Sequence, residues 1–483
     1  MLTGFSGRLG DMYGHKRLFM VGWAWFAATS FLCGFCYNWN VMAFSICRAL
    51  QGVGPAICIP NAIALIGRTF PVGLPRNLAF ACFGLAGPTG ATAGAFFAAL
   101  VAQLAWWPWN FWILSMVCLM VLVLAKLIIP NETPKSPSSS NNSRFDYLGC
   151  ITGVSGLVLF NFALNQAPLV SWSRWYIPTT LALGLLFLAA FIHVELHLTS
   201  HPLIPLRGLK AVAGFALACI AAGWSSHGIW AYYLYLYLSQ VRGHTALLTA
   251  AQTSPVALTG VFFALSTVYL LRKIDVSFVM LMSMTNFLIG SLLLALMPLR
   301  QTYWLQTFFS VLIMPGAMNL SFPAATILLS SAMPREDQGI AASLVATMVN
   351  YCISCGLGFA GTVHRYSLVR ASEKYGVAGP LMPVAEGDPV ETEIRATAIR
   401  GPWFFAVGLS GIGVVVAGWF VVGTVWYRRR EREEKLMERT RARGEQVEKY
   451  QGKRSQAKIK NDEMNQREII ARKRDEERER QKL

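Results

Sequence analysis

The chain has 483 residues, of which 54% are hydrophobic and only 14% are charged. A water-soluble fold with this balance could not cover its surface with polar groups, so the composition excludes a soluble protein and indicates a bilayer. The formal net charge of +17 does not indicate nucleic-acid binding. The last 56 residues hold 20 Lys and Arg against 13 Asp and Glu, and most other cations lie in short loops, a distribution typical of membrane topology.

Apolar runs long enough to cross about 30 Å of hydrocarbon recur about a dozen times along the chain. We predict a membrane-spanning helix in each, and therefore an all-α polytopic membrane protein, with spans at residues 18–36, 41–66, 77–103, 108–129, 147–167, 176–197, 211–238, 246–271, 276–298, 303–331, 338–362 and 402–427. Lys and Arg gather in alternate loops and in the tail. This bias predicts that both termini face the cytoplasm, and we expect the plasma membrane as the location.

Composition also predicts the organisation of the chain. The expected segments are a helical bundle at 1–129, a cytoplasmic Pro/Ser-rich linker at 130–145, a helix pair at 146–198, a six-helix bundle at 208–427 and a basic charged tail at 428–483. The tail shows no apolar stripe and is expected to form at most a solvated, fraying helix. Binding of anionic lipid or of a partner by the tail stands as an alternative to a plain stop-transfer anchor.

An internal repeat links two of the predicted spans. Pro60 and Pro71 are eleven residues apart, as are Pro323 and Pro334, and both segments run toward the cytoplasm. Parallel repeats of this kind are typical of transporters built from two like halves around an axis normal to the membrane. The sequence therefore predicts two pseudo-repeated helical bundles.

The most specific motif occupies residues 7–17. Gly7 and Gly14 bracket a tight cytoplasmic turn, Asp11 can lie at a helix N-terminus or face a cation, and Lys16 and Arg17 can hold the turn at the headgroups. A basic turn next to the membrane, without further role, is the alternative. The pattern resembles the signature G-x-L-a-D-x-x-G-x-[RK]-[RK] of the major facilitator superfamily, in which it joins the second and third spans.

A second motif places a cation inside a predicted span. Arg48 is followed by Gln51, Gly52 and Gly54, and an arginine near mid-membrane costs roughly 2.5 to 3.5 kcal/mol, so it should face a cavity or a partner and not lipid. The stretch resembles the R-x-x-Q-G-x-G motif of the family's fourth span, which is associated with coupling. An arginine that only holds neighbouring carbonyl groups remains the structural alternative.

A third motif spaces small residues along the span at 77–103. Gly84, Gly87 and Gly90 would permit close helix approach, and Pro88 would bend the helix. The stretch resembles the family's antiporter motif, although Gly90-Ala91 stands where that motif has Gly-Gly. This departure weakens the export direction that the resemblance implies.

These resemblances together cover residues 1 to about 427. The three motifs precede the first, second and third predicted spans, whereas the family has them before spans three, four and five. The resemblance thus implies about 12 of the 14 spans of the 14-span drug:proton antiporters, a chain that begins inside the second family span, and an extra central helix pair. Residues 161–168 are also similar to fungal aminotriazole-resistance and boric-acid-exporter relatives, some of which are described as low-affinity ammonium transporters.

The implied function is export of a drug, toxicant or boric-acid-like solute by a monomer that alternates access, with exchange for protons left open. A transport-inactive fragment or a membrane sensor that kept the fold is the alternative from a different class. No nucleotide-binding loop, metal cluster or nucleophile constellation is visible in the sequence, so we expect neither an enzyme nor a cofactor.

Few polar residues in the spans could serve transport. The unperturbed pKa of a histidine suits His227 to proton exchange, but the pattern favours a neutral, hydrogen-bonded core histidine. Candidates for a substrate cavity are the polar or aromatic residues Asn61, Trp224, Gln252, Asn319 and Asn350. Each of these could instead hydrogen-bond neighbouring helices.

Overall fold

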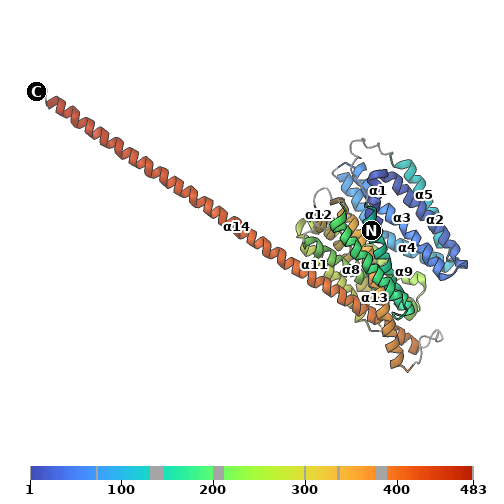
Figure 1. Cartoon of the computed structure of the whole chain (residues 1–483). Coiled ribbons are helices and arrows are strands. Elements are labelled where there is room, and N and C mark those ends of the chain that lie inside the picture. Colours follow the sequence, from blue (N-terminus) through green and yellow to red (C-terminus); the bar gives the residue numbers. More distant parts are fainter. Residues whose placement is uncertain are drawn as a thin grey trace. The chain divides into compact units, whose positions relative to one another are not determined.

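The computed structural model describes residues 2–71, 74–130, 146–199, 211–298, 301–333, 338–376 and 389–480. Every predicted span falls on a helix (Figure 1), and the α-helices are α1 (Leu2–Tyr13), α2 (His15–Phe35), α3 (Val41–Thr69), α4 (Leu74–Leu104), α5 (Trp109–Ile128), α6 (Tyr147–Val170), α7 (Tyr176–His193), α8 (Ala211–Leu236), α9 (Ala246–Thr253), α10 (Pro255–Lys273), α11 (Val276–Ala295), α12 (Gln306–Ser331), α13 (Gln338–Lys374) and α14 (Pro389–Arg480). Among the described residues, 11 helical segments are long and apolar enough to cross a membrane, and α4 adds the shorter apolar stretch Thr89–Leu104. The predicted all-α polytopic class is confirmed.

Short polar caps begin several helices. The side chains of Asn40 and Asp146 each accept a hydrogen bond of 2.8 Å from the backbone N–H three residues on, at the starts of α3 and α6. Thr245 does the same for α9 at 3.3 Å. Such caps satisfy backbone donors that have no partner inside the helix, so each span can start close to the end of the previous one.

Two sets of helices repeat the same packing. Helix α2 packs along α3 as α11 packs along α12, and α1 packs on α3 as α10 packs on α12. The matched prolines Pro60 and Pro323 lie inside α3 and α12. The packing therefore agrees with the repeat predicted from the proline spacing.

Pro323 interrupts the hydrogen-bond pattern of α12 beside α10. Pro323 has no N–H, so the carbonyl group of Asn319 loses its usual helical donor. The hydroxyl of Thr267 on α10 lies 3.2 Å from that carbonyl oxygen and 2.7 Å from the Phe263 carbonyl oxygen of its own helix, so its one hydrogen is shared between the two. The contact with α12 is the longer branch of this shared hydrogen bond and partly satisfies the Asn319 carbonyl group.

The helix pair α6 and α7 is fastened to α13. The two helices pack on each other, and α6 packs on α13. Asn161 of α6 donates to the hydroxyl of Ser354 at 2.8 Å. At Gly358 of α13 an added Cβ would lie 2.9 Å from the side chain of Leu164, so the helices approach closely there. The boundaries predicted for the five segments stay predictions, and residues 131–145 of the linker lie outside the described residues.

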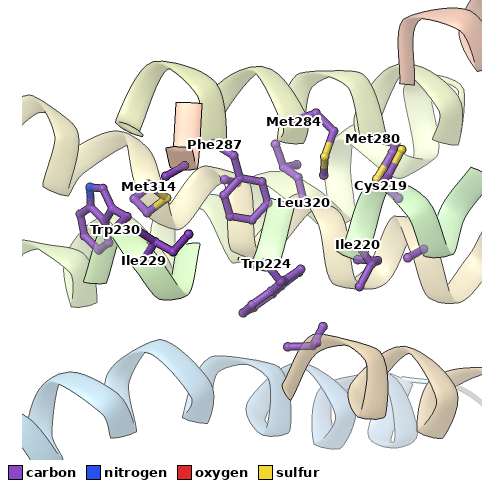
Figure 2. Packing of buried hydrophobic residues seen from close by; sticks show 14 of the residues in the cluster. Cys219, Ile220, Trp224, Ile229, Trp230, Met280, Met284, Phe287, Met314 and Leu320 are labelled. Carbon is purple, nitrogen blue, oxygen red and sulfur yellow. The ribbon is translucent and has the colours of Figure 1, made fainter. Parts of the chain in front are cut away.

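The residues of the main apolar core all come from the part of the chain between Ala213 and Ala417. Figure 2 shows part of it, where Trp224 and Trp230 of α8 lie near Phe287 and Met284 of α11 and near Met314 of α12. None of the described residues of α1 to α5 belongs to this cluster. The two repeated halves thus differ in how they fill their interiors.

The chain divides into two compact units, Met1–Phe420 and Val421–Leu483. Helix α14 continues without interruption through Arg480, so the tail is more regularly helical than the fraying helix that we expected at most. Its side chains that are described beyond Arg428 are exposed.

Two glycines set the contact between α2 and α3. A Cβ added at Gly22 would lie 2.6 Å from Sγ of Cys58, and one added at Gly54 would lie 2.6 Å from Cβ of Phe26. The Cβ added at each of these glycines would also lie 3.0 Å from the carbonyl oxygen of the other glycine. Gly52 lies two residues earlier in the same motif, and a Cβ added there would meet no heavy atom within 4 Å. Close packing therefore explains Gly54 and does not explain Gly52.

This difference gives a direct test. We expect Gly54→Ala to lower the free energy of unfolding by about 1–3 kcal/mol, because the added methyl group overpacks the contact with α2. Gly52→Ala, the matched control, should leave stability unchanged or raise it, since its methyl group meets no atom within 4 Å. Thermal unfolding of the purified full chain measures both variants. Equal losses of stability in the two variants would contradict the packing described for α2 and α3.

Candidate functional site

The motif at residues 7–17 forms the turn between α1 and α2. Gly14 has φ 97° and ψ 129°, a backbone conformation that other residues rarely adopt, and its N–H donates to the carbonyl oxygen of Gly10 at 2.9 Å. A Cβ added at Gly7 would make only an ordinary van der Waals contact with Pro60, at 3.9 Å. The side chain of Asp11 lies outside the described residues, so its role in gating stays a prediction.

A buried polar network starts at this turn and reaches α3. Nδ1 of His15 lies 2.8 Å from Oδ1 of Asn61. The amide nitrogen of Asn61 donates to the hydroxyl of Ser6 and to the carbonyl oxygen of Ile57, both at 2.7 Å. A Cβ at Gly10 would lie 2.1 Å from Asn61 Oδ1 and 2.2 Å from His15 Nδ1. Any side chain at position 10 would therefore collide with the two atoms that form this hydrogen bond, and glycine avoids the collision.

The contacts of Asn61 match the second of its two predicted roles, hydrogen bonding between helices. The residue is 0% exposed, and its side-chain amide is engaged on both sides by α1 and α2. The amide thus belongs to a network that joins three helices, and a place in the substrate cavity stays a prediction. The physical reason is that a buried amide in a helical bundle needs partners, and the turn supplies them.

Lys16 connects the turn to a fourth helix. Its ammonium group donates to the carbonyl oxygens of Lys126, at 3.4 Å, and of Ile129. These carbonyl groups belong to the last turn of α5, where helical partners are missing and a positive charge is favourable. Arg17 is exposed. The turn is therefore bound to both α3 and α5.

The arginine motif forms a second polar cluster, in α3. Arg48 donates to the side-chain oxygen of Gln51, and its guanidinium lies 5.4 Å from the ring centroid of Phe111 on α5. Gln51 is 2% exposed and donates to the hydroxyl of Ser30 on α2 at 2.6 Å. Arg48 itself is exposed. Its charge thus has a polar partner and an aromatic face while remaining accessible.

The small-residue motif of α4 does not behave as predicted. Gly87 and Gly90 are exposed, and an added Cβ at either would meet no heavy atom within 4 Å. Helix α4 packs chiefly on α9 and α10, so the contact with those helices uses other positions than these glycines. The expected close approach at Gly87 and Gly90 is therefore wrong for this structure, while the side chains at 84 and 88 lie outside the described residues.

Aromatic rings surround His227 in α8. Trp230 stacks on the imidazole with ring centroids 5.8 Å apart and an interplanar angle of 23°, and Trp224 meets it edge-on at 5.5 Å. Phe287 of α11 lies 6.4 Å away. Nδ1 of His227 is buried without a hydrogen-bond partner among the described residues. Figure 2 shows these tryptophans on α8 beside Phe287.

Hydrogen bonds to α12 hold the two tryptophans. The indole N–H of Trp224 donates to the hydroxyl of Ser321 at 3.1 Å, and that of Trp230 donates to the hydroxyl of Ser310 at 2.7 Å. Ser310 in turn donates to the carbonyl oxygen of Gly290. Because both rings are tied at one end, they form a firm wall around the imidazole. We name Trp224, His227, Trp230 and Phe287 the aromatic clamp.

The other predicted cavity residues do not join the aromatic clamp. Oε1 of Gln252 lies 3.0 Å from Nδ1 of His244, and the Gln252 carbonyl oxygen accepts from the hydroxyl of Tyr303. Burial raises the pKa of Tyr303 to about 12, so this hydroxyl stays a donor at neutral pH. The amides of Asn319 and Asn350 donate to carbonyl oxygens of their own helices. These hydrogen bonds do not join the five candidates to one another, so a common substrate cavity stays a prediction.

The sequence analysis did not identify two residues that the structure places at the centre of contacts, His15 and Trp230. His15 lies inside the signature motif, yet only its contact with Asn61 reveals it as the centre of a network. Trp230 was one aromatic residue among several on α8, and its stacking on His227 is a tertiary fact. Helical spacing was the available signal for the second, because residues 224, 227 and 230 recur every third position.

Comparison with known proteins finds similar sequences over most of the chain. Residues 1–359 match the family model described as Major Facilitator Superfamily. The chain is 43% identical over 433 residues to a protein of Saccharomyces cerevisiae named low affinity ammonium transporter, covering 89% of this chain and 80% of the relative. It is 36% identical over 426 residues to the efflux pump terJ of Aspergillus terreus, covering 86% and 77%.

Solved structures show the same fold at low sequence identity. A POT family transporter, solved in complex with a thioalcohol conjugated peptide, superimposes with a TM-score of 0.57 at 12% identity, covering 88% of this chain and 85% of the other. At this identity the likeness concerns the fold alone.

The position of Asn61 separates a structural role from a binding role. We expect Asn61→Leu to cost about 1–3 kcal/mol for each buried partner left unsatisfied, and therefore to lower the thermal stability and the membrane abundance of the full chain. Asn350→Leu is the matched control, because Asn350 is exposed and its amide donates only to the Ala346 carbonyl oxygen. If Asn61→Leu kept normal stability and changed only which solutes are handled, Asn61 would return to the substrate cavity.

Proposed function

The chain belongs to the Major Facilitator Superfamily, and on this premise we propose that it exports a small neutral or cationic compound from the cytoplasm by alternating access. It is an integral membrane transporter and not an enzyme. In the proposed cycle the two repeated halves rock against each other around a central pathway. The cluster around Arg48 would face that pathway, because the Arg48 side chain is exposed.

One observation supports this proposal above the others, namely the asymmetry between the repeats. The position 263 residues after Arg48 is Val311, and the position 263 residues after Gln51 is Met314. Both Val311 and Met314 are 0% exposed in the apolar core. If Arg48 only braced packing common to both halves, its counterpart would be charged or polar too. A coupling or substrate-orienting group is needed once, which favours such a role for Arg48.

The direction of transport and the class of solute rest on the relatives. The relative from Aspergillus terreus carries the name efflux pump, which favours export of a drug-like or toxic compound. Another is named a low affinity ammonium transporter, and this favours a second candidate function, movement of ammonium or a similar small cation. Cations are attracted to the faces of tryptophan rings, so the aromatic clamp suits the second candidate as well.

Accumulation assays separate the two candidates. The full chain is expressed in yeast cells that lack their own homologues, and cellular levels of aminotriazole, boric acid and radiolabelled methylammonium are measured. Export predicts lower levels of one or both toxicants than in cells with an empty vector. Faster entry of methylammonium with unchanged toxicant levels would overturn export and support the ammonium function. No change for any solute at normal membrane abundance would favour a transport-inactive protein.

Exchange for protons is a further part of the proposal. His227 is the titratable residue of the aromatic clamp, and its ring sits between groups that cannot take up a proton at neutral pH. Protonation and release as access changes sides would couple solute to protons. The pH gradient dependence of efflux in vesicles tests this role, and efflux insensitive to an imposed gradient would remove it.

The orientation yields a topological prediction. Arg428, Arg429 and Arg430 follow the last span directly, and clustered cations are retained on the cytoplasmic side. We expect a reporter fused after Leu483 to be active only in its cytosolic form, with the protein at the plasma membrane. Digestion of the tail by protease added outside intact cells would contradict both the orientation and the predicted cytoplasmic termini.

The proposal for Arg48 predicts a loss of transport without a loss of protein. Arg48→Ala should slow efflux about tenfold, which corresponds to roughly 1.4 kcal/mol of lost stabilisation in the transport cycle. Arg48→Lys should be impaired too, because lysine lacks the planar fork that reaches Gln51. Arg454→Ala in the tail controls for the removal of one cation, and surface abundance is measured for all three variants. Normal efflux by Arg48→Ala at normal abundance would assign Arg48 a structural role.

A further inference from the structure

Cations and apolar residues recur with a regular spacing along part of the charged tail. At alternating steps of four and three residues, α14 carries Lys453, Ala457, Lys460, Met464, Arg467, Ala471 and Arg474. Residues spaced in this way lie along one face of a helix. All seven side chains are exposed. We name this row the basic seam.

The same spacing continues toward the N-terminus in the sequence. Stepping back from Lys453 leads to Tyr450, and further steps reach Arg439 and Leu436. The steps between Tyr450 and Arg439 fall on Gln446 and Arg443, so cations and apolar residues alternate strictly only from Tyr450 to Arg474. This is more than three heptads with the 3.5-residue period of a coiled-coil seam. The absence of a broad apolar stripe agrees with our sequence analysis, but the narrow seam was missed because its members are mixed in chemistry.

Cations outnumber carboxylates around the seam. Between residues 453 and 474 eight Lys and Arg stand against three Asp and Glu. Glu463 is three residues from Lys460 and four from Arg467, and Glu477 is three residues from Arg474, so the helix offsets part of this charge and leaves an excess of cations. The ion pairs found among the described residues of α14 are Glu391 with Arg395 and Glu433 with Arg429. Neither of these pairs involves the seam. The row thus presents positive charge that a partner can meet.

We propose that the basic seam docks an acidic amphipathic helix of another protein and forms a heterologous coiled coil with it. The partner would place carboxylates opposite Lys453, Lys460, Arg467 and Arg474, and apolar side chains opposite Ala457, Met464 and Ala471. Parallel pairing of two copies of this chain would bring like charges together at every heptad, and antiparallel pairing would place each cation against alanine or methionine, so neither arrangement supplies the seam with carboxylates. Charge complementarity selects the acidic partner.

A membrane surface fits the seam less well than a helix does. The apolar positions within the described seam are alanine and methionine, and they offer little area for burial among lipid chains. Glu463 and Glu468 flank the row, and carboxylates weaken attraction to anionic lipid. A narrow seam with regular heptad spacing is what a second helix recognises.

The test uses the full chain in nanodiscs of neutral phosphatidylcholine. The probe is a fluorescent synthetic helix of about four heptads that carries glutamate and leucine at alternating seam positions. Fluorescence anisotropy measures its dissociation constant. The expected result is saturable binding that weakens about tenfold or more when Lys453, Lys460, Arg467 and Arg474 are all replaced by Glu.

The chain offers a matched control with the same change of charge. Arg454→Glu, Lys458→Glu, Arg472→Glu and Lys473→Glu replace four cations that lie off the seam, and this combined variant should bind the probe within about threefold of the original chain. A probe of the same composition in scrambled order should bind weakly. These readouts do not depend on transport, so their failure would leave the proposed export untouched.

Several results would overturn the proposal. Equal loss of binding in the seam and control variants would show that only net charge matters. Equal binding of the scrambled probe would do the same. Phosphatidylserine vesicles that displace the probe through the seam cations would assign the row to a lipid surface, and tail-dependent dimers of the chain would assign it to self-association.

Discussion

The need to satisfy backbone and side-chain polar groups without water governs this protein. In hydrocarbon each unpaired peptide group costs several kcal/mol, so the described spans are helices and their polar side chains bond to neighbouring helices. Where Pro323 removes a donor from α12, Thr267 of α10 partly replaces it. The same constraint turns several hydrogen-bonding residues into contacts between helices, as at Asn61 and Trp224.

The two halves solve this constraint differently. The first half gathers polar chemistry at Arg48, Gln51 and Asn61, whose counterparts 263 residues later are Val311, Met314 and Ala324. All three counterparts are 0% exposed in the apolar core. The second half instead packs tryptophan, phenylalanine and methionine, with its indole groups tied to serines of α12. A repeated backbone thus carries a one-sided set of functional groups, as expected when a coupling group is needed once.

The motif at residues 7–17 gains a physical explanation from this arrangement. Gly10 leaves space for the hydrogen bond between His15 and Asn61, Gly14 supplies a positive φ, and Lys16 caps α5. The turn is therefore bound to α3 and α5 at once. A segment joined to several helices can transmit a change at the cytoplasmic end to the bundle, which is the role that gating requires.

The sequence alone determined the helical class, the position of every span and the pairing of the two prolines, because hydropathy and topology follow from local composition. It could not determine which polar residues meet. Asn61 was a candidate both for a substrate cavity and for bonding between helices and lies in a buried network, whereas Gly87 and Gly90 were expected in a helix contact and are open. Whether a side chain bonds a helix or faces a pathway depends on how helices far apart in sequence rotate against each other, and only the tertiary packing sets that rotation.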